Sequence, residues 1–540
     1  MNAADLKHET FRDFLERLRA AGELADIRKA VDIRYIATLV DQSEQALLFH
    51  NVIGYRTPVV SGIFRSPRRT ALALGCERFS EIEEKLRRAL EQPISPGLAK
   101  DGARRTVMAS GEAVDLFSLP VPVCSIYDGG PMITAGVVMA RDPEYGFNAG
   151  VYRLLVKERN LTGIDIVTPN NLRLYAERAL ARGEPCPISV SIGAHPFDIM
   201  GAGYRAPLGM DEMGLAGGLR GAPTRLAACE TIDVPCVHDA EFVLEAEILP
   251  TGWTWPEGRF GEFTRLMGGL HWNPLVRVKA ITQRPDPIYY SLHMPWENTW
   301  LGAPTRYAAI RAALKTAGVQ VKDINVTIGG CAMWHAVISV KKQAGEGKNA
   351  LLAALSVMDV KHVVVVDDDI DVYNPVDVEW AIATRVQGDR DVFVVPGARA
   401  KPLDPSLPIV PQGTVPTGAK VGIDATIGEG IPRERYERIS YAHADMAKIK
   451  DYLGAAEEPQ SASRAVSADR IGKLAQEIHA RIEKAPLYYS EIAAQFSTYD
   501  FQTVARALGR LHADGKLWQD PRGRMCLRDS AFAARPPSRG

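Results

Sequence analysis

The distribution of apolar residues changes near residue 305, and this change constrains the fold more than any other feature of the chain. From about 112 to 310, short runs rich in β-branched residues alternate with dense prolines and glycines, which predicts a sheet of many strands. Beyond it, helical patterns alternate with buried strands such as Val363-Val364-Val365-Val366, as in α/β domains with both sheet faces covered. A chain of 540 residues is also too long for one core. We therefore predict a multidomain fold of the α+β and α/β classes.

Changes in composition predict four domains. Residues 1–110 are expected to form a small α+β domain, residues 111–305 a barrel-like sheet, and residues 306–454 an α/β domain. Residues 455–468 are rich in Ala, Ser and Glu, which is typical of a flexible linker. Residues 469–530 show three helical patterns and then two short strands. Three helices followed by a hairpin are the pattern of a winged-helix domain.

Composition excludes several classes of protein. The net charge is −1, so the whole molecule is no polyanion binder. No apolar run reaches the roughly 18 residues that span a bilayer, and the N-terminus lacks the apolar region of a signal peptide, so we expect a cytoplasmic protein. The seven cysteines are scattered without a C-x-x-C pair, which argues against a disulfide framework and structural zinc. Nicotinamide and ATP chemistry lack support because neither glycine-rich phosphate motif is present.

Two carboxylates five residues apart, Glu257 and Glu262, are candidates for acid/base catalysis. Arg153, about a hundred residues earlier, is a candidate to lie between them. A guanidinium can hold one carboxylate ionised while the other carries or releases a proton near neutral pH. Two glutamates in a loop are more often simply solvated. A catalytic acid here would need burial against Phe260 and Phe263 to raise its pKa.

These residues lie in a series of short segments along the chain, namely Asp115–Pro120, Asp128–Thr134, Asn148–Arg153, Asp211–Gly217, Pro256–Glu262, Asp367–Asp371 and Trp380–Arg385. In this order, the segments resemble the UbiD family of reversible decarboxylases. The resemblance covers roughly residues 10 to 450. It implies a flavin-reductase-like split β-barrel at residues 111–305 that holds the cofactor, and an oligomerisation domain at 306–454. The winged-helix-like tail is not part of the family core.

The family uses prenylated FMN, a divalent metal and a monovalent cation. By resemblance, Glu262 donates the proton that replaces CO₂, while Arg153 and Glu257 tune it and hold the substrate. The resemblance implies non-oxidative decarboxylation of an aromatic or α,β-unsaturated carboxylic acid, or of its aryl-CoA thioester. The substrate and the physiological direction of the reaction stay open. His293, Trp296 and Trp334 are candidates for a pocket wall, with core packing as the default interpretation.

Asn148 and Glu212 are the candidate metal ligands, because hard oxygen donors suit Mn²⁺ or Mg²⁺, with Fe²⁺ as an alternative. The family also uses a histidine, and this chain offers only Asn170 or Asn171 near its expected place. We expect Asn171 as the third ligand. The loop Met200–Tyr204 is the expected site of K⁺ or Na⁺. The predicted cofactor contacts are Asn148, Val151, Tyr152, Arg153, Asn170, Asn171 and Glu212.

Two other functions are considered. A ligand-sensing regulator would bind DNA through the winged-helix tail, but the tail lacks a clear basic stripe, which argues against nucleic-acid binding. An ordinary FMN oxidoreductase would have no need of the Glu-Arg-Glu set. The resemblance also implies a homo-oligomer, either a dimer or a hexamer, and a flavin prenyltransferase that supplies the cofactor.

Overall fold

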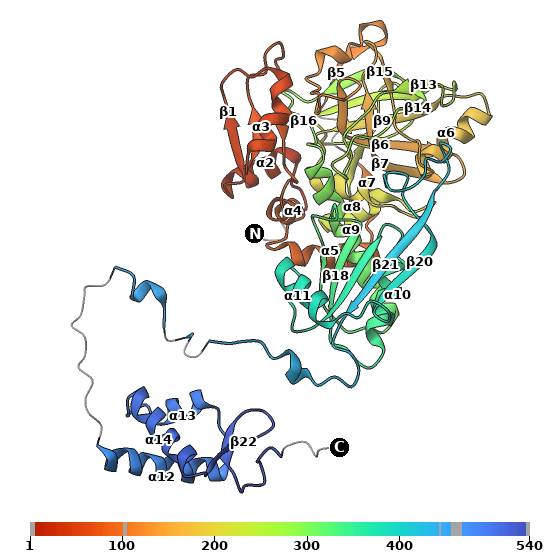
Figure 1. Cartoon of the computed structure of the whole chain (residues 1–540). Helices are drawn as coiled ribbons and strands as arrows, with labels where there is room; N and C mark the ends of the chain where they lie inside the picture. Colours follow the sequence, from red (N-terminus) through yellow and green to blue (C-terminus); the bar gives the residue numbers. More distant parts are fainter. Residues whose placement is uncertain (1–5, 101–104, 442–443, 446, 455–466, 536–540) are drawn as a thin grey trace. The chain divides into compact units, whose positions relative to one another are not determined.

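A computed structural model describes residues 6–100, 105–441, 444–445, 447–454 and 467–535. The chain divides into two compact units, Met1–Ile431 and Pro432–Gly540 (Figure 1). The first unit contains all the predicted site residues. The four-domain boundaries predicted from the sequence stay a prediction.

Residues 6–91 form helices around a small sheet. Helix α2 begins after Thr10, whose side chain forms a capping box with Asp13, and it buries Phe11, Phe14 and Leu15 as the helical spacing predicts. The sheet order is β1-β2-β3-β16, so its last strand comes from almost 230 residues further along the chain. The elements are α2 (Phe11–Ala20), β1 (Leu24–Ile27), α3 (Ile36–Gln42), β2 (Ala46–Phe49), β3 (Val59–Ser61), α4 (Pro67–Ala73), α5 (Ile82–Glu91) and β16 (Tyr289–Tyr290).

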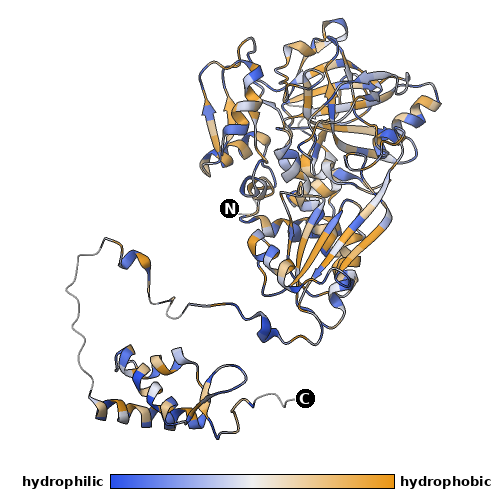
Figure 2. Ribbon diagram, in the orientation of Figure 1, coloured by the Kyte–Doolittle hydropathy of each residue, from blue (hydrophilic) through white to orange (hydrophobic). Residues whose placement is uncertain are grey.

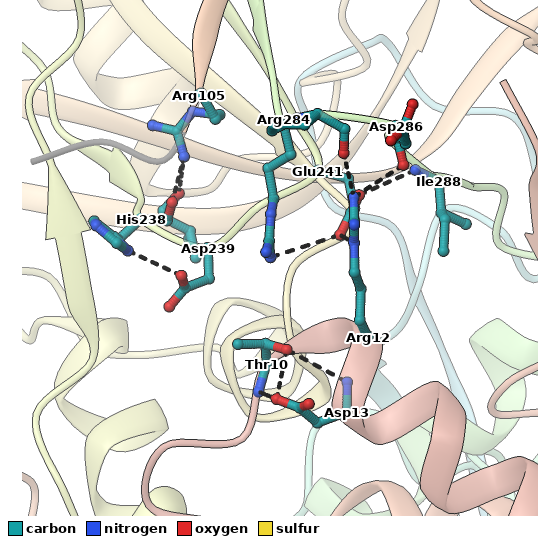
Figure 3. A network of polar contacts seen from close by, with 12 residues as sticks. Thr10, Arg12, Asp13, Arg105, His238, Asp239, Glu241, Arg284, Asp286 and Ile288 are labelled. Atoms are coloured by element: carbon teal, nitrogen blue, oxygen red, sulfur yellow. Dashed lines mark hydrogen bonds and ion pairs between the residues drawn. The ribbon is translucent and has the colours of Figure 1, made fainter. Parts of the chain in front are cut away.

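A buried glutamate ties this region to the central sheet. Glu241, which has no exposed surface, accepts hydrogen bonds from Arg12 at 2.8 and 2.7 Å (Figure 3). It also accepts one from the Ile288 backbone at 3.0 Å and lies 3.8 Å from Arg284. Helix α2 is thereby fastened to the segment that leads into β16. This contact joins the N-terminal helix to the central region.

The central region is built on a seven-stranded antiparallel sheet of order β5-β15-β12-β9-β6-β7, with β8 beside β15. The paired strands form an open path, and closure into a split barrel stays a prediction. The sheet strands are β5 (Thr106–Ser110), β6 (Met132–Asp142), β7 (Gly146–Leu155), β8 (Leu161–Gly163), β9 (Cys186–Ile192), β12 (Phe242–Ile248) and β15 (Leu275–Gln283). Around it lie α6 (Asn171–Ala181), α7 (Pro196–Gly203), α8 (Glu212–Arg220), β4 (Gly97–Leu98), β10 (Arg225–Ala227), β11 (Cys236–Val237), β13 (Trp255–Glu257) and β14 (His271–Asn273).

The third region of this unit is a five-stranded sheet with helices packed on it. Its order is β17-β18-β19-β21-β20, with parallel pairing in the middle and antiparallel edges. The β18 and β19 strands are almost entirely buried. Figure 2 shows orange stretches among the strands of this sheet. The elements are α9 (Trp296–Thr316), β17 (Val321–Val326), β18 (His335–Val340), α10 (Glu346–Leu355), β19 (His362–Asp367), α11 (Pro375–Arg385), β20 (Val392–Arg399) and β21 (Thr417–Ala425).

The second unit contains the predicted three helices and two strands. Its core joins Leu474 and Ile478 of α12 to Val504 and Leu508 of α14. The element order agrees with the sequence prediction, and the winged-helix assignment itself stays a prediction. The elements are α12 (Ala468–Lys484), α13 (Tyr489–Gln495), α14 (Phe501–Ala513), β22 (Leu517–Gln519) and β23 (Met525–Leu527).

Candidate active site

Arg153, Glu257 and Glu262 lie together in the first unit, as the sequence predicts. Arg153 is near the end of β7, Glu257 ends β13, and Glu262 lies in the turn between β13 and β14. Arg153 Nη1 donates to Glu262 Oε1 at 2.6 Å, and Arg153 Nε lies 3.9 Å from Glu257 Oε1. The guanidinium therefore lies between the two carboxylates, with a direct hydrogen bond to Glu262 only.

Glycines allow the chain to make this arrangement. A Cβ atom at Gly258 would lie 2.9 Å from the Gly129 Cα atom, so the turn after Glu257 can approach its neighbour only without a side chain. A Cβ atom at Gly163 would overlap Glu257 Oε2, so the glycine leaves room for the carboxylate. The Glu257 carboxylate is 1% exposed, and its two oxygens lack hydrogen-bond partners among the described residues.

Two residues that the sequence did not single out complete the cluster. Asp165 follows β8, and its Oδ2 atom lies 2.5 Å from Arg153 Nη2. His271, on β14, lies 3.5 Å from both Asp165 Oδ2 and Arg153 Nη2 through its Nδ1 atom. Neither residue has a local sequence signal, because only the sheet pairing brings them to Arg153.

Burial controls the protonation of the cluster. It raises the pKa of Glu262 and of Glu257 above the ordinary glutamate value, even though Arg153 acts in the opposite direction on both. Burial also acts to raise the pKa of Asp165, but Arg153 and His271 outweigh it and bring that pKa to about 2. The hydrogen bond to Asp165 raises the pKa of His271. The Glu262 side chain can thus carry a proton beside a permanent cation.

Aromatic rings provide the burial that the sequence analysis required. Phe260 and Phe263 are 3% and 5% exposed, and the Arg153 guanidinium lies over the Phe260 ring at 5.1 Å. Trp334 packs edge-on against Phe263 with ring centroids 5.5 Å apart. Trp334 therefore packs in the apolar surroundings of Phe263, in line with the default interpretation of core packing.

A cavity of about 430 Å³ opens beside Glu262. Its size is that of pockets that take small organic ligands. Helix α3 contributes to the wall, so the N-terminal region completes the pocket. His293 and Trp296 line it, as expected for two of the three wall candidates. Its other side-chain contributors include Asp41, Arg265, Leu266, Met267 and Met294.

Asn148 and Glu212 also lie together. Asn148 Nδ2 donates to Glu212 Oε1 at 2.8 Å, and the Ala149 backbone donates to Glu212 Oε2 at 2.9 Å. Asn148 Oδ1 is buried and has no hydrogen-bond partner in the part of the chain that the structure describes. Burial raises the pKa of Glu212 to about 7. A carboxylate kept from solvent beside an unpartnered amide oxygen fits a hard divalent ion, which would favour the ionised carboxylate.

The other predicted cofactor contacts differ in the hydrogen bonds that they make. Asn170 Oδ1 caps α6 by accepting from the Arg173 backbone at 2.9 Å, and it also accepts from the Tyr152 hydroxyl at 3.4 Å. Asn171 Nδ2 donates to the Ala206 carbonyl at 3.3 Å, which leaves its side-chain oxygen for another partner. The backbone of Val151 and Tyr152 lies on β7 between Asn148 and Arg153.

The predicted cation loop Met200–Tyr204 is not a loop. Met200–Gly203 forms the last part of α7, with the Tyr204 backbone bonded to Gly201. The glycines and alanine in this stretch suggested a turn, but burial of the helix against its neighbours favours small residues there. Helix ends still offer backbone carbonyls. The K⁺ or Na⁺ site stays a prediction.

A cluster of cations that the sequence analysis missed surrounds one carboxylate. Asp359 lies 2.7 Å from Arg306, 3.4 Å from Lys401 and 3.8 Å from Arg205. Burial lowers the pKa of Lys401 to about 7 despite Asp359. Lys401 also lies 5.1 Å from the centre of the Phe263 ring, next to Glu262. Three basic groups on one carboxylate leave an excess of positive charge that suits a phosphate.

Comparison with known families decides what this site belongs to. The model of the 3-octaprenyl-4-hydroxybenzoate carboxy-lyase N-terminal domain matches residues 15–89, that of the Rift-related domain residues 99–295, and that of the C-terminal domain residues 299–425. The chain belongs to the UbiD family. Its matched segments include every residue of the Glu-Arg-Glu cluster.

Similar proteins include decarboxylases. The anhydromevalonate phosphate decarboxylase of Methanothermobacter thermautotrophicus is 35% identical over 435 residues, which cover 79% of this chain and 99% of that one. The structure of the UbiD-class enzyme HmfF from Pelotomaculum thermopropionicum in complex with FMN is 38% identical, covers 82% of this chain and 100% of that one, and has a TM-score of 0.76. The 3,4-dihydroxybenzoic acid decarboxylase of Enterobacter cloacae is 25% identical, with a TM-score of 0.72 and coverage of 82% and 98%.

These matches make the chain a carboxy-lyase of the UbiD class, a class with structures that hold FMN or prenylated FMN. The mixed α+β multidomain fold agrees with these structures. In the described part of the chain, none of the helices combines the length and the apolar character needed to cross a bilayer.

Proposed function

We propose that this UbiD-class enzyme uses prenylated FMN to decarboxylate a small aromatic or α,β-unsaturated carboxylic acid without oxidation. The observation that carries the proposal is the buried Glu262 carboxyl, held by Arg153 at the edge of a 430 Å³ cavity. A cavity of this size suits a free acid of one or two rings better than an aryl-CoA thioester. The apolar contributions of Leu266, Met267 and Trp296 suit a flat apolar body.

The chain's own residues would divide the work. Bound prenylated FMN would supply an electron sink for the electrons left when CO₂ departs. Glu262 holds a proton in a dry site, because burial raises its pKa, and it donates that proton to the carbon that loses CO₂. Arg153 orients Glu262 through the 2.6 Å hydrogen bond. Glu257 offsets part of the positive charge of the Arg153 guanidinium from the Nε side.

Asn148 and Glu212, with Asn171 as a third ligand, would hold Mn²⁺, Mg²⁺ or Fe²⁺. Among the described residues, no three His, Cys, Asp or Glu side chains gather into a metal site, so amide oxygens are needed to complete one. Neutral amide oxygens favour hard ions over zinc. We further propose that Lys401 and Arg205 face the flavin phosphate, which would raise the pKa of Lys401 again.

The assembly and the tail are also proposals. An evolved form of HmfF is dimeric, which supports a homo-oligomer here. A flavin prenyltransferase would have to supply the cofactor. The tail would be a winged-helix domain for assembly or substrate access, because the charges of Arg506 and Arg510 on α14 are offset by Asp500 and Asp514 at its ends. The regulator alternative finds no support, since the similar proteins include decarboxylases.

The test begins with the cofactor. The full chain is produced together with a flavin prenyltransferase, and mass spectrometry of the released flavin is expected to give the mass of prenylated FMN. A panel of aromatic and α,β-unsaturated acids, with and without a CoA thioester, is then screened for CO₂ release. A loaded protein that releases no CO₂ from any acid, or that turns over only the thioesters, would contradict the proposed substrate class.

A further inference from the structure

Arg153 is shared among three carboxylates. Asp165 lies at 2.5 Å on Nη2, Glu262 at 2.6 Å on Nη1 and Glu257 at 3.9 Å on Nε. Asp165 is therefore as close to the guanidinium as the candidate acid is. Its side chain is 16% exposed, so solvent screens this contact only weakly. The carboxylate of Asp165 is also within 3.5 Å of His271.

The charge balance shows what Asp165 does. Arg153 contributes one positive charge and His271 at most one more, whereas three ionised carboxylates would contribute three negative ones. A buried cluster of this composition reaches neutrality only when one glutamate keeps a proton. Without Asp165, one negative charge fewer would lie beside Arg153, so Glu262 would lose its proton more readily. The additional carboxylate thus makes the cluster retain an acid.

We propose that Asp165, anchored by His271, is a positioning residue that occupies one edge of the Arg153 guanidinium and so keeps a proton on Glu262. The effect of Asp165 on turnover rests on the proposed function, whereas its effect on the Glu262 proton does not. The charged groups that face Glu262 come from every element around it. They are Arg153 of β7, Asp165 after β8, Glu257 of β13 and His271 of β14, with Asp128 at the Gly261 backbone, and Asp41 of α3, Arg265 and His293 across the cavity.

The two partners act on Glu262 with opposite signs. Asp165 raises the pKa of Glu262, whereas His271 lowers it, and the effect of Asp165 is the larger. Replacing Asp165 should therefore lower the pH at which Glu262 loses its proton, even though His271 loses its own partner. Replacing His271 should raise that pH. A residue needed only for folding would give no such pair of opposite shifts.

The experiment is an infrared titration of the full, cofactor-loaded chain. The carboxyl band that disappears in Glu262→Gln identifies the Glu262 proton, and its midpoint is followed with pH. We expect Asp165→Asn to lower the midpoint by about one pH unit or more, and His271→Gln to raise it. Glu158→Gln, which changes an exposed carboxylate just after the same β7 strand, should leave the midpoint unchanged.

The outcomes separate this inference from the proposed function. Opposite shifts in a protein that releases no CO₂ would leave the role of Asp165 intact and refute the proposed function. Unchanged midpoints in both variants, or shifts of the same sign, would overturn the role of Asp165 even in an active enzyme. If Asp165→Asn does not fold, the His271→Gln variant still tests the proposal. A midpoint of Glu262 that falls or stays unchanged in that variant would contradict it.

Discussion

Substituting Gly163 with alanine should separate the position of Glu257 from the stability of the fold. Gly163 lies on β8, opposite Leu275 of β15, and its backbone needs no left-handed conformation. A Cβ atom there would overlap Glu257 Oε2 and lie 3.3 Å from Glu257 Cδ. Since carbon–oxygen contacts need roughly 3.3 Å, the carboxylate must move by about 1 Å. The atom that must move is the far end of a side chain, so the strand itself is not forced apart.

The expected magnitude follows from this geometry. A displacement of about 1 Å in a catalytic group can cost about 10²-fold in rate. Alanine in a strand gains about 0.5–1 kcal/mol over glycine, which offsets the cost of moving Glu257. We therefore expect the initial rate of CO₂ release to fall about 100-fold while the melting temperature changes by no more than about 3 °C.

A matched control lies in the same site. Gly269 is in the turn between Glu262 and His271, and a Cβ atom there would meet nothing within 4 Å. Gly269→Ala should therefore keep the wild-type rate. The flavin absorbance of both variants shows whether the cofactor is retained. A Gly163→Ala enzyme with normal turnover would mean that Glu257 need not lie where the structure has it, and the reasoning would fail.

Three further predictions concern the acid, the metal and the tail. Glu262→Gln should keep the fold and the cofactor but lose about 10²- to 10⁴-fold in turnover. In the wild type, whose Glu262 pKa is raised, the rate of CO₂ release should hold below that pKa and fall as the pH rises through it. A flat pH profile together with an active Gln variant would remove Glu262 from the mechanism. Glu212→Ala should lower bound metal and flavin together, measured by elemental analysis and absorbance, and unchanged metal content would refute the assignment. Deleting residues 456–540 should alter oligomer size or turnover, while tight, salt-sensitive binding of duplex DNA by the full chain would revive the regulator hypothesis.

Local patterns predicted the elements whose signals are local. The spacing of Phe11, Phe14 and Leu15 predicted α2, and β6 and β9 were expected from their β-branched runs. The sequence analysis did not predict strand β21, although it lies inside the five-stranded sheet of the first unit. Its residues Gly418, Lys420 and Gly422 are poor strand formers. Tertiary pairing with β19 and β20 overrides that preference. The helical pattern of residues 307–318 predicted a helix, but α9 begins at Trp296, eleven residues earlier and ahead of Pro304. The apolar pattern could not reveal this start, because a proline inside a helix argues against it.

The sequence alone determined the family and the Glu-Arg-Glu set, because these depend on short segments whose residue types chemistry restricts. Only the tertiary structure decided that Asp165 shares Arg153, that Lys401 joins Arg205 around Asp359, and that helix α3 completes the cavity wall. These residues have no local signal. Their roles come from strand pairing and burial, which bring together side chains that are far apart in the chain and give each charge its neighbours.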